Sequence, residues 1–315
     1  MRTNGQIAAV LLLAAFAAVG CSKPFEDPEK KTQQQPPVSA QAKPIAVPTA
    51  GDLKDEEGTS GYVGTKSTGP VSFADADAAY QAKNYSEAAR LFEQYTQGRP
   101  SNAWGHFMLG LSAWKAGDLM KAEGAFEEAL KIDPNHVKSL VNLSRVLIDQ
   151  RRFDDALVRL THAGEVDPSS IDVQRLLGRV YAAQHKTDEA VNAYRRAIAL
   201  DARDAWSMNN LGLLFLEQDH AEEALPLLCR AVQLRNDVAA LHNNLGMALE
   251  HTGRFLAAAE EYRGALTADP GYGKAMQNLA RVEAIKTGPE EPFDFAAMAK
   301  RSEEAPSADQ TTAVR

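Results

Sequence analysis

Small and large apolar residues return along this chain at a constant interval of 34 positions. Alanines form one such series: Ala88, Ala122, Ala156, Ala190, Ala224 and Ala258. Large apolar residues hold a second: Phe92, Phe126, Leu160, Tyr194, Leu228 and Tyr262. Small residues hold a third: Ala76, Gly110, Ser144, Gly178, Gly212, Gly246 and Ala280. No insertion shifts the register, so we interpret this stretch as a stack of repeats.

Within each repeat the pattern predicts two amphipathic helices. In the last full repeat, Leu241, Leu245 and Leu249 share one helical face, and Gly253 ends that helix. The second helix then gathers its apolar residues on one side: Phe255, Ala258, Tyr262, Ala265 and Leu266. We expect the small residue Gly246 to lie where the two helices cross, leaving room for a large one such as Tyr262.

This arrangement resembles the tetratricopeptide repeat, whose pattern here is Leu-Gly … Ala … Phe/Tyr … Ala … Pro at period 34. The resemblance implies an all-α solenoid over residues 71–286, with six helix-turn-helix repeats and a capping helix at about 273–286. The repeats begin near Pro70, Asn102, Val137, Ile171, Ala205 and Ala239. The first repeat is degenerate, because Asp75 stands where leucine is expected.

The first 20 residues have the pattern of an export signal. Arg2 precedes an uncharged apolar run at 7–19, which is shorter than the roughly 20 residues that span a bilayer. "AAVGC" then resembles the lipobox of bacterial lipoproteins, which implies that Cys21 is lipidated and anchors the protein. We expect the outer membrane, facing the periplasm. The alternative is an ordinary secretory signal that ends near a cysteine.

Two segments flank the repeats. Residues 21–70 are rich in Pro, Gln, Gly, Ser and Lys and have few large apolar residues, which predicts a disordered tether. Such a tether would reach roughly 40 Å from the membrane. Residues 287–315 are predicted to form a similarly disordered tail.

In the tetratricopeptide family the first helix of each repeat lines a concave face, so the resemblance implies a groove for a protein or peptide partner. Its aromatic and apolar end would hold Trp104, Phe107 and Met108. A cationic middle would hold Lys138, Asn142, Arg145, Arg175 and Arg179. The remaining positions are Trp206, Asn209, Asn210, Asn243, Asn244, Lys274 and Asn278.

The recurrent asparagines of this groove allow two interpretations. An amide both donates and accepts, so it could pair with the backbone of an extended peptide. It could equally hydrogen-bond between neighbouring helices. Arg175 and Arg179 lie at i, i+4 on one helical face, where like charges are mildly unfavourable. We take this pair to favour an acidic partner.

Composition narrows the functional classes. The formal charge is −8 and no basic run is present, which argues against a nucleic-acid partner. The histidines lack metal-ligand spacing, and no H-E-x-x-H, G-x-S-x-G or phosphate loop occurs. Cys229 is expected to be a small buried apolar residue. The sequence therefore predicts no enzyme, no cofactor and no metal site.

What remains is a membrane-anchored scaffold of the bacterial envelope. Its combination of lipobox, tether and repeats resembles the pilus-assembly lipoproteins of type IV and tight-adherence (Flp) systems, which implies an envelope partner such as a secretin. It also resembles adaptors that recruit peptidoglycan hydrolases at the outer membrane. This alternative stays open.

Overall fold

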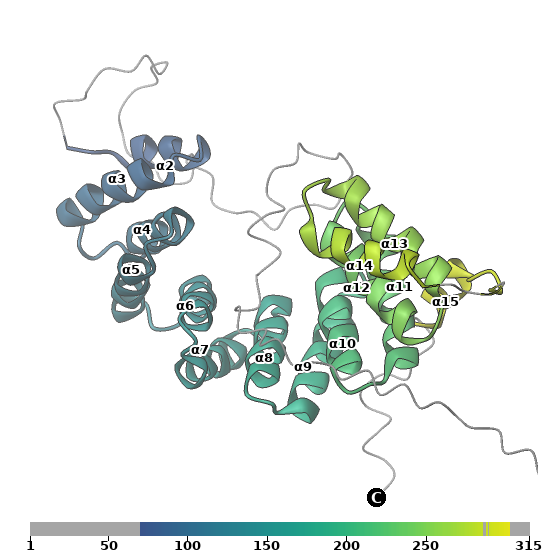
Figure 1. Ribbon diagram of the computed structural model, residues 1–315. Helices are drawn as coiled ribbons and strands as arrows, with labels where there is room; N and C mark the ends of the chain where they lie inside the picture. The colour runs from purple at the N-terminus through teal and green to yellow at the C-terminus, as the bar shows by residue number, and fades with distance from the viewer. Residues whose placement is uncertain (1–69, 286–287, 289, 303–315) are drawn as a thin grey trace, which may run out of the picture. The chain divides into compact units, whose positions relative to one another are not determined.

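The computed structural model describes residues 70–285, 288 and 290–302, and this part of the chain holds fourteen helices and no strand (Figure 1). Six consecutive hairpins are formed by α2 (Phe73–Gln81) and α3 (Tyr85–Gly98), α4 (Ala103–Ala116) and α5 (Leu119–Ile132), α6 (Val137–Asp149) and α7 (Phe153–Val166), α8 (Ile171–Ala183) and α9 (Thr187–Leu200), α10 (Ala205–Glu217) and α11 (Ala221–Leu234), and α12 (Ala239–His251) and α13 (Phe255–Ala268). Then follow α14 (Gly273–Glu283) and α15 (Phe295–Arg301). The predicted all-α fold of helical hairpins followed by a capping helix is confirmed.

Each hairpin closes by placing a large side chain against a small residue. A Cβ added to Gly246 would lie 2.5 Å from Cε1 of Tyr262, and one added to Gly110 would lie 2.7 Å from Cδ1 of Phe126. Both distances are too short for any side chain larger than hydrogen. The role predicted for Gly246 is therefore confirmed.

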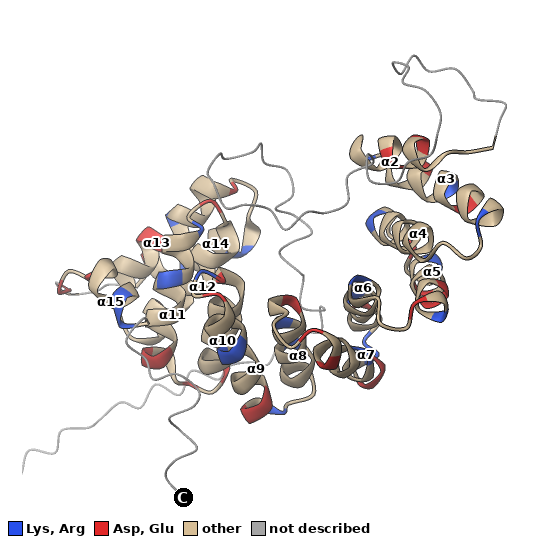
Figure 2. Cartoon of the chain, turned by 180° about the vertical axis from the view of Figure 1, so that it is seen from behind, with Lys and Arg blue, Asp and Glu red and all other residues tan. Residues whose placement is uncertain are grey.

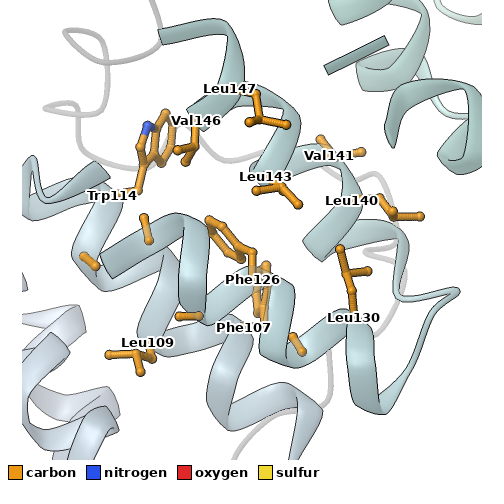
Figure 3. Close-up of a cluster of buried hydrophobic side chains, with 14 of the residues drawn as sticks. Phe107, Leu109, Trp114, Phe126, Leu130, Leu140, Val141, Leu143, Val146 and Leu147 are labelled. Atoms are coloured by element: carbon orange, nitrogen blue, oxygen red, sulfur yellow. The ribbon is translucent and has the colours of Figure 1, made fainter. Parts of the chain in front are cut away.

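The core continues from one hairpin to the next. In repeats two and three, Phe107 and Phe126 pack beside leucine and valine side chains of α6, among them Leu140 and Leu143 (Figure 3). Trp114 is 7% exposed, and its Nε1 donates to Oδ2 of Asp149, 3.1 Å away on the next repeat. Burial of such side chains between repeats is the main source of stability in a solenoid.

The turn between the two helices of each repeat contains a residue in the left-handed region. The six residues are spaced by 34 positions and have φ between 58° and 88°: Lys83, Gly117, Arg151, His185, Asp219 and Gly253. Left-handed backbone is unfavourable for residues with a Cβ. The chain nevertheless uses glycine at only two of the six turns.

The departure at Asp75 has a local cause. Ser72 and Asp75 form a capping box: the Asp75 amide donates to Ser72 Oγ at 3.2 Å, and the Ser72 amide donates to Asp75 Oδ2 at 3.3 Å. This reciprocal pairing satisfies two amides at the start of α2. The carboxylate thus starts the first helix of the stack instead of packing in a core.

The predicted disordered tail needs a correction. Helix α15 lies within the predicted 287–315 segment and packs on α11. Its Ala299 is only 1% exposed. The predicted export signal, Cys21 and the 21–70 tether lie outside the described residues, as does 303–315. No helix among the described residues is both long and apolar enough to cross a membrane.

Candidate partner-binding face

The first helices of the repeats form one continuous row. Neighbours along the row contact each other, from α4 to α6, α8, α10, α12 and finally α14. We call the surface of these helices the first-helix face. It carries the predicted positions that are half-buried or exposed: Trp104, Lys138, Asn142, Arg175, Arg179, Trp206, Asn244, Lys274 and Asn278.

One end of this face holds an aromatic cluster. The Trp104 and Phe107 ring centroids are 4.9 Å apart, and Lys138 Nζ lies 4.9 Å from the Trp104 ring. Phe107 and Met108 are only 5% and 6% exposed. The prediction that these two residues contact a partner is corrected, because they belong to the core. Trp104 remains at the surface as the outer member of the cluster.

His136 borders the same cluster. Its ring lies edge-on to Trp104 at 5.9 Å and to Phe107 at 5.3 Å, and its Nδ1 is 2.7 Å from Ser139 Oγ. Burial lowers the pKa of His136 below its ordinary value, because the charged imidazolium loses solvation. The aromatic end of the face therefore holds a neutral imidazole near pH 7.

Two arginines of the predicted cationic stretch form ion pairs with aspartates of the same chain. Arg175 pairs with Asp172 and with Asp204, the latter at 3.1 Å. Arg145, which is 8% exposed, lies 3.4 Å from Asp172. Their guanidinium charges thus have intramolecular partners. Arg175 therefore gives no reason to expect an acidic partner, and the prediction is corrected for this residue. Arg145 is also buried away from the surface.

Asp204 connects this ion-pair group to the start of α10. Its Oδ1 accepts from the Trp206 amide at 3.2 Å, and its Oδ2 accepts from Ser207 Oγ at 2.5 Å. A capping carboxylate is favoured there by the helix dipole. Trp206 begins the same helix half-buried, with the Arg235 guanidinium 5.8 Å from its ring centroid. The tryptophan is therefore fixed in place at the surface.

The asparagines form a hydrogen-bonded chain along α10, α12 and α14. Nδ2 of Asn278 donates to Asn243 at 2.9 Å, and Nδ2 of Asn244 donates to Asn209 at 2.8 Å. Within each pair, Asn243 donates to Asn244 at 3.4 Å and Asn209 donates to Asn210 at 3.3 Å. The structure thus shows the helix-to-helix interpretation at these positions.

Burial separates the asparagines into two groups. Asn209, Asn210 and Asn243 are 3%, 7% and 2% exposed, so they do not present their amides at the surface. Asn244 and Asn278 are half-buried at the edge of the chain of amides. Asn142 differs from all of these, since its Nδ2 donates to the Lys138 carbonyl of its own helix at 2.8 Å.

The chain of amides ends in a charged group that holds the capping helix. Arg281 donates to Asn278 Oδ1 at 2.9 Å and to both oxygens of Glu250 at 2.9 and 2.7 Å. Tyr262 also donates to Glu250, at 2.8 Å. Burial raises the pKa of Glu250, but the hydrogen bonds from Arg281 and Tyr262 lower it by more. The net pKa of Glu250 is therefore below its ordinary value. Glu250 therefore stays ionised and fixes α14 to repeat six.

Acidic residues gather elsewhere, on the second helices. Figure 2 shows them at the ends of α7, α9 and α11, and the first turns of these helices hold Asp154, Asp155, Asp188, Glu189, Glu222 and Glu223. Carboxylates are stabilised at helix N-termini by the helix dipole.

The described residues offer no metal-binding group of three or more His, Cys, Asp or Glu side chains. Cys229 is fully buried, and burial raises the pKa of its thiol far above the ordinary value. It behaves as the small core residue that the sequence predicts.

Hairpins of 34 residues that stack through one row of helices define a helical-repeat protein of the interaction-scaffold class. Two family models match the chain: a tetratricopeptide repeat-like domain over residues 66–211 and a tetratricopeptide repeat over 209–273. The chain belongs to the tetratricopeptide repeat family.

Solved structures agree with this fold. A chain of the APC/C hetero-tetramer Cut9–Hcn1 is 18% identical with a TM-score of 0.59, over 66% of this chain and 41% of that one. Pseudomonas aeruginosa pilF is 18% identical with a TM-score of 0.57, over 66% of this chain and 95% of that one. A thermophilic TPR protein of Thermus thermophilus is 20% identical with a TM-score of 0.51, over 58% of this chain and 100% of that one. No curated protein sequence matches the chain.

Proposed function

We propose that this protein is a non-catalytic scaffold that holds a segment of an envelope protein on its first-helix face. The observation that carries the proposal is the position of Trp104 and Trp206, which lie half-buried on the same row of helices. Tryptophan is over-represented among residues that dominate binding energy, and an indole already fixed by its neighbours loses little entropy on binding.

The polar groups of the face indicate what kind of segment it takes. Between and beyond the tryptophans lie Lys138, Asn142, Asn244 and Lys274. Amides and ammonium groups pair well with backbone carbonyls and with carboxylates. The partner segment is therefore one with apolar anchors and an accessible backbone, bound in an extended or irregular conformation.

The proposal places this scaffold at the outer membrane, anchored through Cys21 and facing the periplasm. The lipobox-like "AAVGC" supports the anchor, and the run of polar residues after it supports a tether. For the pathway we propose pilus or secretin assembly, on the resemblance to pilus-assembly lipoproteins. The name of the structural neighbour pilF agrees with this pathway. Recruitment of peptidoglycan hydrolases is the second candidate, because those adaptors share the same architecture.

A matched pair of variants of the full chain tests the binding face. Lys138→Glu with Trp206→Ser alters the first-helix face, whereas Lys131→Glu with Val158→Ser makes comparable changes on the second helices α5 and α7. Val158 is 65% exposed, so the control change is tolerated. After cross-linking in envelope extract, we expect one protein to be captured by the wild-type chain and by the control but lost from the first variant. Equal capture by both variants contradicts the proposal.

The captured protein then decides between the two pathways. A secretin or pilus component, with loss of fibres when the gene is deleted, supports pilus assembly. A murein hydrolase, with altered envelope integrity after deletion, supports the adaptor alternative.

A further inference from the structure

A second surface of the molecule is already occupied by the chain itself. Residues 290–302 return to repeats five and six, where α15 packs on α11. This surface belongs to second helices and is separate from the first-helix face. Three contacts hold the segment there, and each has its own chemistry.

The first contact is a carboxylate at a helix start. Glu290 accepts from the Phe255 amide at 3.2 Å and from the Leu256 amide at 2.9 Å, the first two residues of α13. The N-cap residue of α13, Arg254, makes no side-chain capping hydrogen bond of its own, as is also true of the N-cap residues of α7, α9 and α11. Glu290 therefore supplies from a distant position the cap that α13 lacks, and the helix dipole favours its charge.

The second contact is a cation–π pair, and the third is apolar. The Arg254 guanidinium lies 5.8 Å from the Phe293 ring centroid, within range of a cation–π interaction. Phe293, Phe295 and Met298 pack half-buried against the core of repeats five and six, and Ala299 is almost fully buried. Phe295, Met298 and Ala299 are spaced as one face of a helix requires. Carboxylate, aromatic ring and apolar helical face together form one recognisable pattern.

We propose that α11 and the start of α13 form a docking site for a short acidic–aromatic helix, and that residues 290–302 are its intramolecular occupant. A helix as short as α15 is not stable alone in water, so its order depends on the site. The site binds a segment that has a carboxylate, an aromatic residue three positions later, and an apolar helical face.

Direct attachment to α14 keeps the segment bound. The connection from the end of α14 at Glu283 to Glu290 is short. A short linker gives its ligand an effective concentration on the order of millimolar. The site is therefore filled in the intact chain and becomes available only when the segment is released.

The test uses a fluorescent peptide with the sequence of residues 290–302 and two forms of the full chain. The released form carries Phe293→Ser, Phe295→Ser and Met298→Ser, which remove the apolar contacts and leave α11 and α13 unchanged. We expect the released chain to bind the peptide at least about tenfold more tightly than the intact chain, because the tethered occupant no longer competes. A peptide with Glu290→Gln and Phe293→Ser is the control and should bind weakly.

Two results overturn the proposal. One is a released chain that keeps its helical circular dichroism but does not bind the peptide. The other is equal binding by the intact and released chains. Should the released chain lose its fold, amide hydrogen exchange in the single variant Glu290→Ala decides: faster exchange at Phe255 and Leu256 alone supports docking, and unchanged exchange there contradicts it.

Discussion

An asparagine in a helix interior costs about half a kcal/mol relative to alanine, yet α10 and α12 each contain an adjacent pair. The hydrogen bonds between repeats account for this cost. Asn244 reaches Asn209, and Asn278 reaches Asn243, each across one repeat. In a buried environment such bonds are strong and their loss is expensive. The amides thus specify how repeats five, six and the capping helix stack.

Replacing a central amide should therefore be costly. Asn243→Ala leaves the Asn278 donor without its acceptor and removes the donor to Asn244, so we expect a loss of about 1–3 kcal/mol in unfolding free energy. Asn142→Ala is the control, because Asn142 bonds only to its own helix, and should cost within about 0.5 kcal/mol. Urea unfolding measures both. Equal effects would mean that the chain of amides contributes no stability.

A second residue-scale prediction concerns pH. Burial lowers the pKa of His242, but its hydrogen-bond partners outweigh this effect. The ring bonds to Glu261 at 2.7 Å and to the Asn236 carbonyl at 3.0 Å, and these bonds together with the Glu261 charge bring the net pKa above its ordinary value. The folded state therefore prefers the protonated ring. The resulting stability is fully present below the unfolded pKa of about 6.5 and is lost as pH rises through the folded pKa.

We accordingly expect Glu261→Gln to lower the unfolding free energy more at about pH 6 than at about pH 9. Thermal unfolding of the wild-type and variant chains at both values measures the difference. A loss that is the same at both pH values would show that the ion pair adds nothing.

The sequence could not place the binding residues individually. Counting positions along the first helices selects residues of one row of helices, but it does not show which of them pack inside the stack. Phe107, Asn209 and Asn243 are buried, although their spacing matches that of surface positions. The aspartates that neutralise Arg175 could not be assigned either, because Asp204 approaches it only when repeats four and five stack.

At the scale of elements, the 34-residue period predicts every helix of the hairpins because small and large residues must meet at each crossing. It does not predict α15, which has no repeat partner. The order of α15 comes from long-range contacts, in which Phe295, Met298 and Ala299 pack against the core of repeats five and six. Glu290, which precedes α15, adds hydrogen bonds to the start of α13.

The left-handed turns give a prediction at this scale. Arg151 has φ of 62° and is exposed, so Arg151→Gly should relieve about 1 kcal/mol of backbone strain. The converse change, Gly253→Ala, introduces that strain at φ of 76° with no atom near the new methyl group, and should destabilise by a similar amount. Urea midpoints of both variants measure the effect. Destabilisation by Arg151→Gly would contradict this account of the turns.

At the scale of the whole molecule, the proposed architecture joins an anchor, a tether and a stack of repeats with two docking surfaces. The anchor is testable alone. We expect Cys21→Ser to move the protein from the membrane fraction to the soluble fraction, since acyl chains supply the membrane affinity. Fractionation with immunoblotting measures the distribution. A variant that stays in the membrane fraction would indicate that something other than Cys21 holds the protein there.

The central claim is that the first-helix face binds an envelope protein, and site-specific photo-cross-linking in cells tests it most directly. A photoreactive residue replaces Lys138 or Lys274 on that face, and Val158 or Met120 on the second helices, where both side chains are well exposed. We predict that the first two positions cross-link to the same envelope protein and the last two do not. Cross-links only from Val158 or Met120 would contradict the claim, because the partner would then be bound by the second helices.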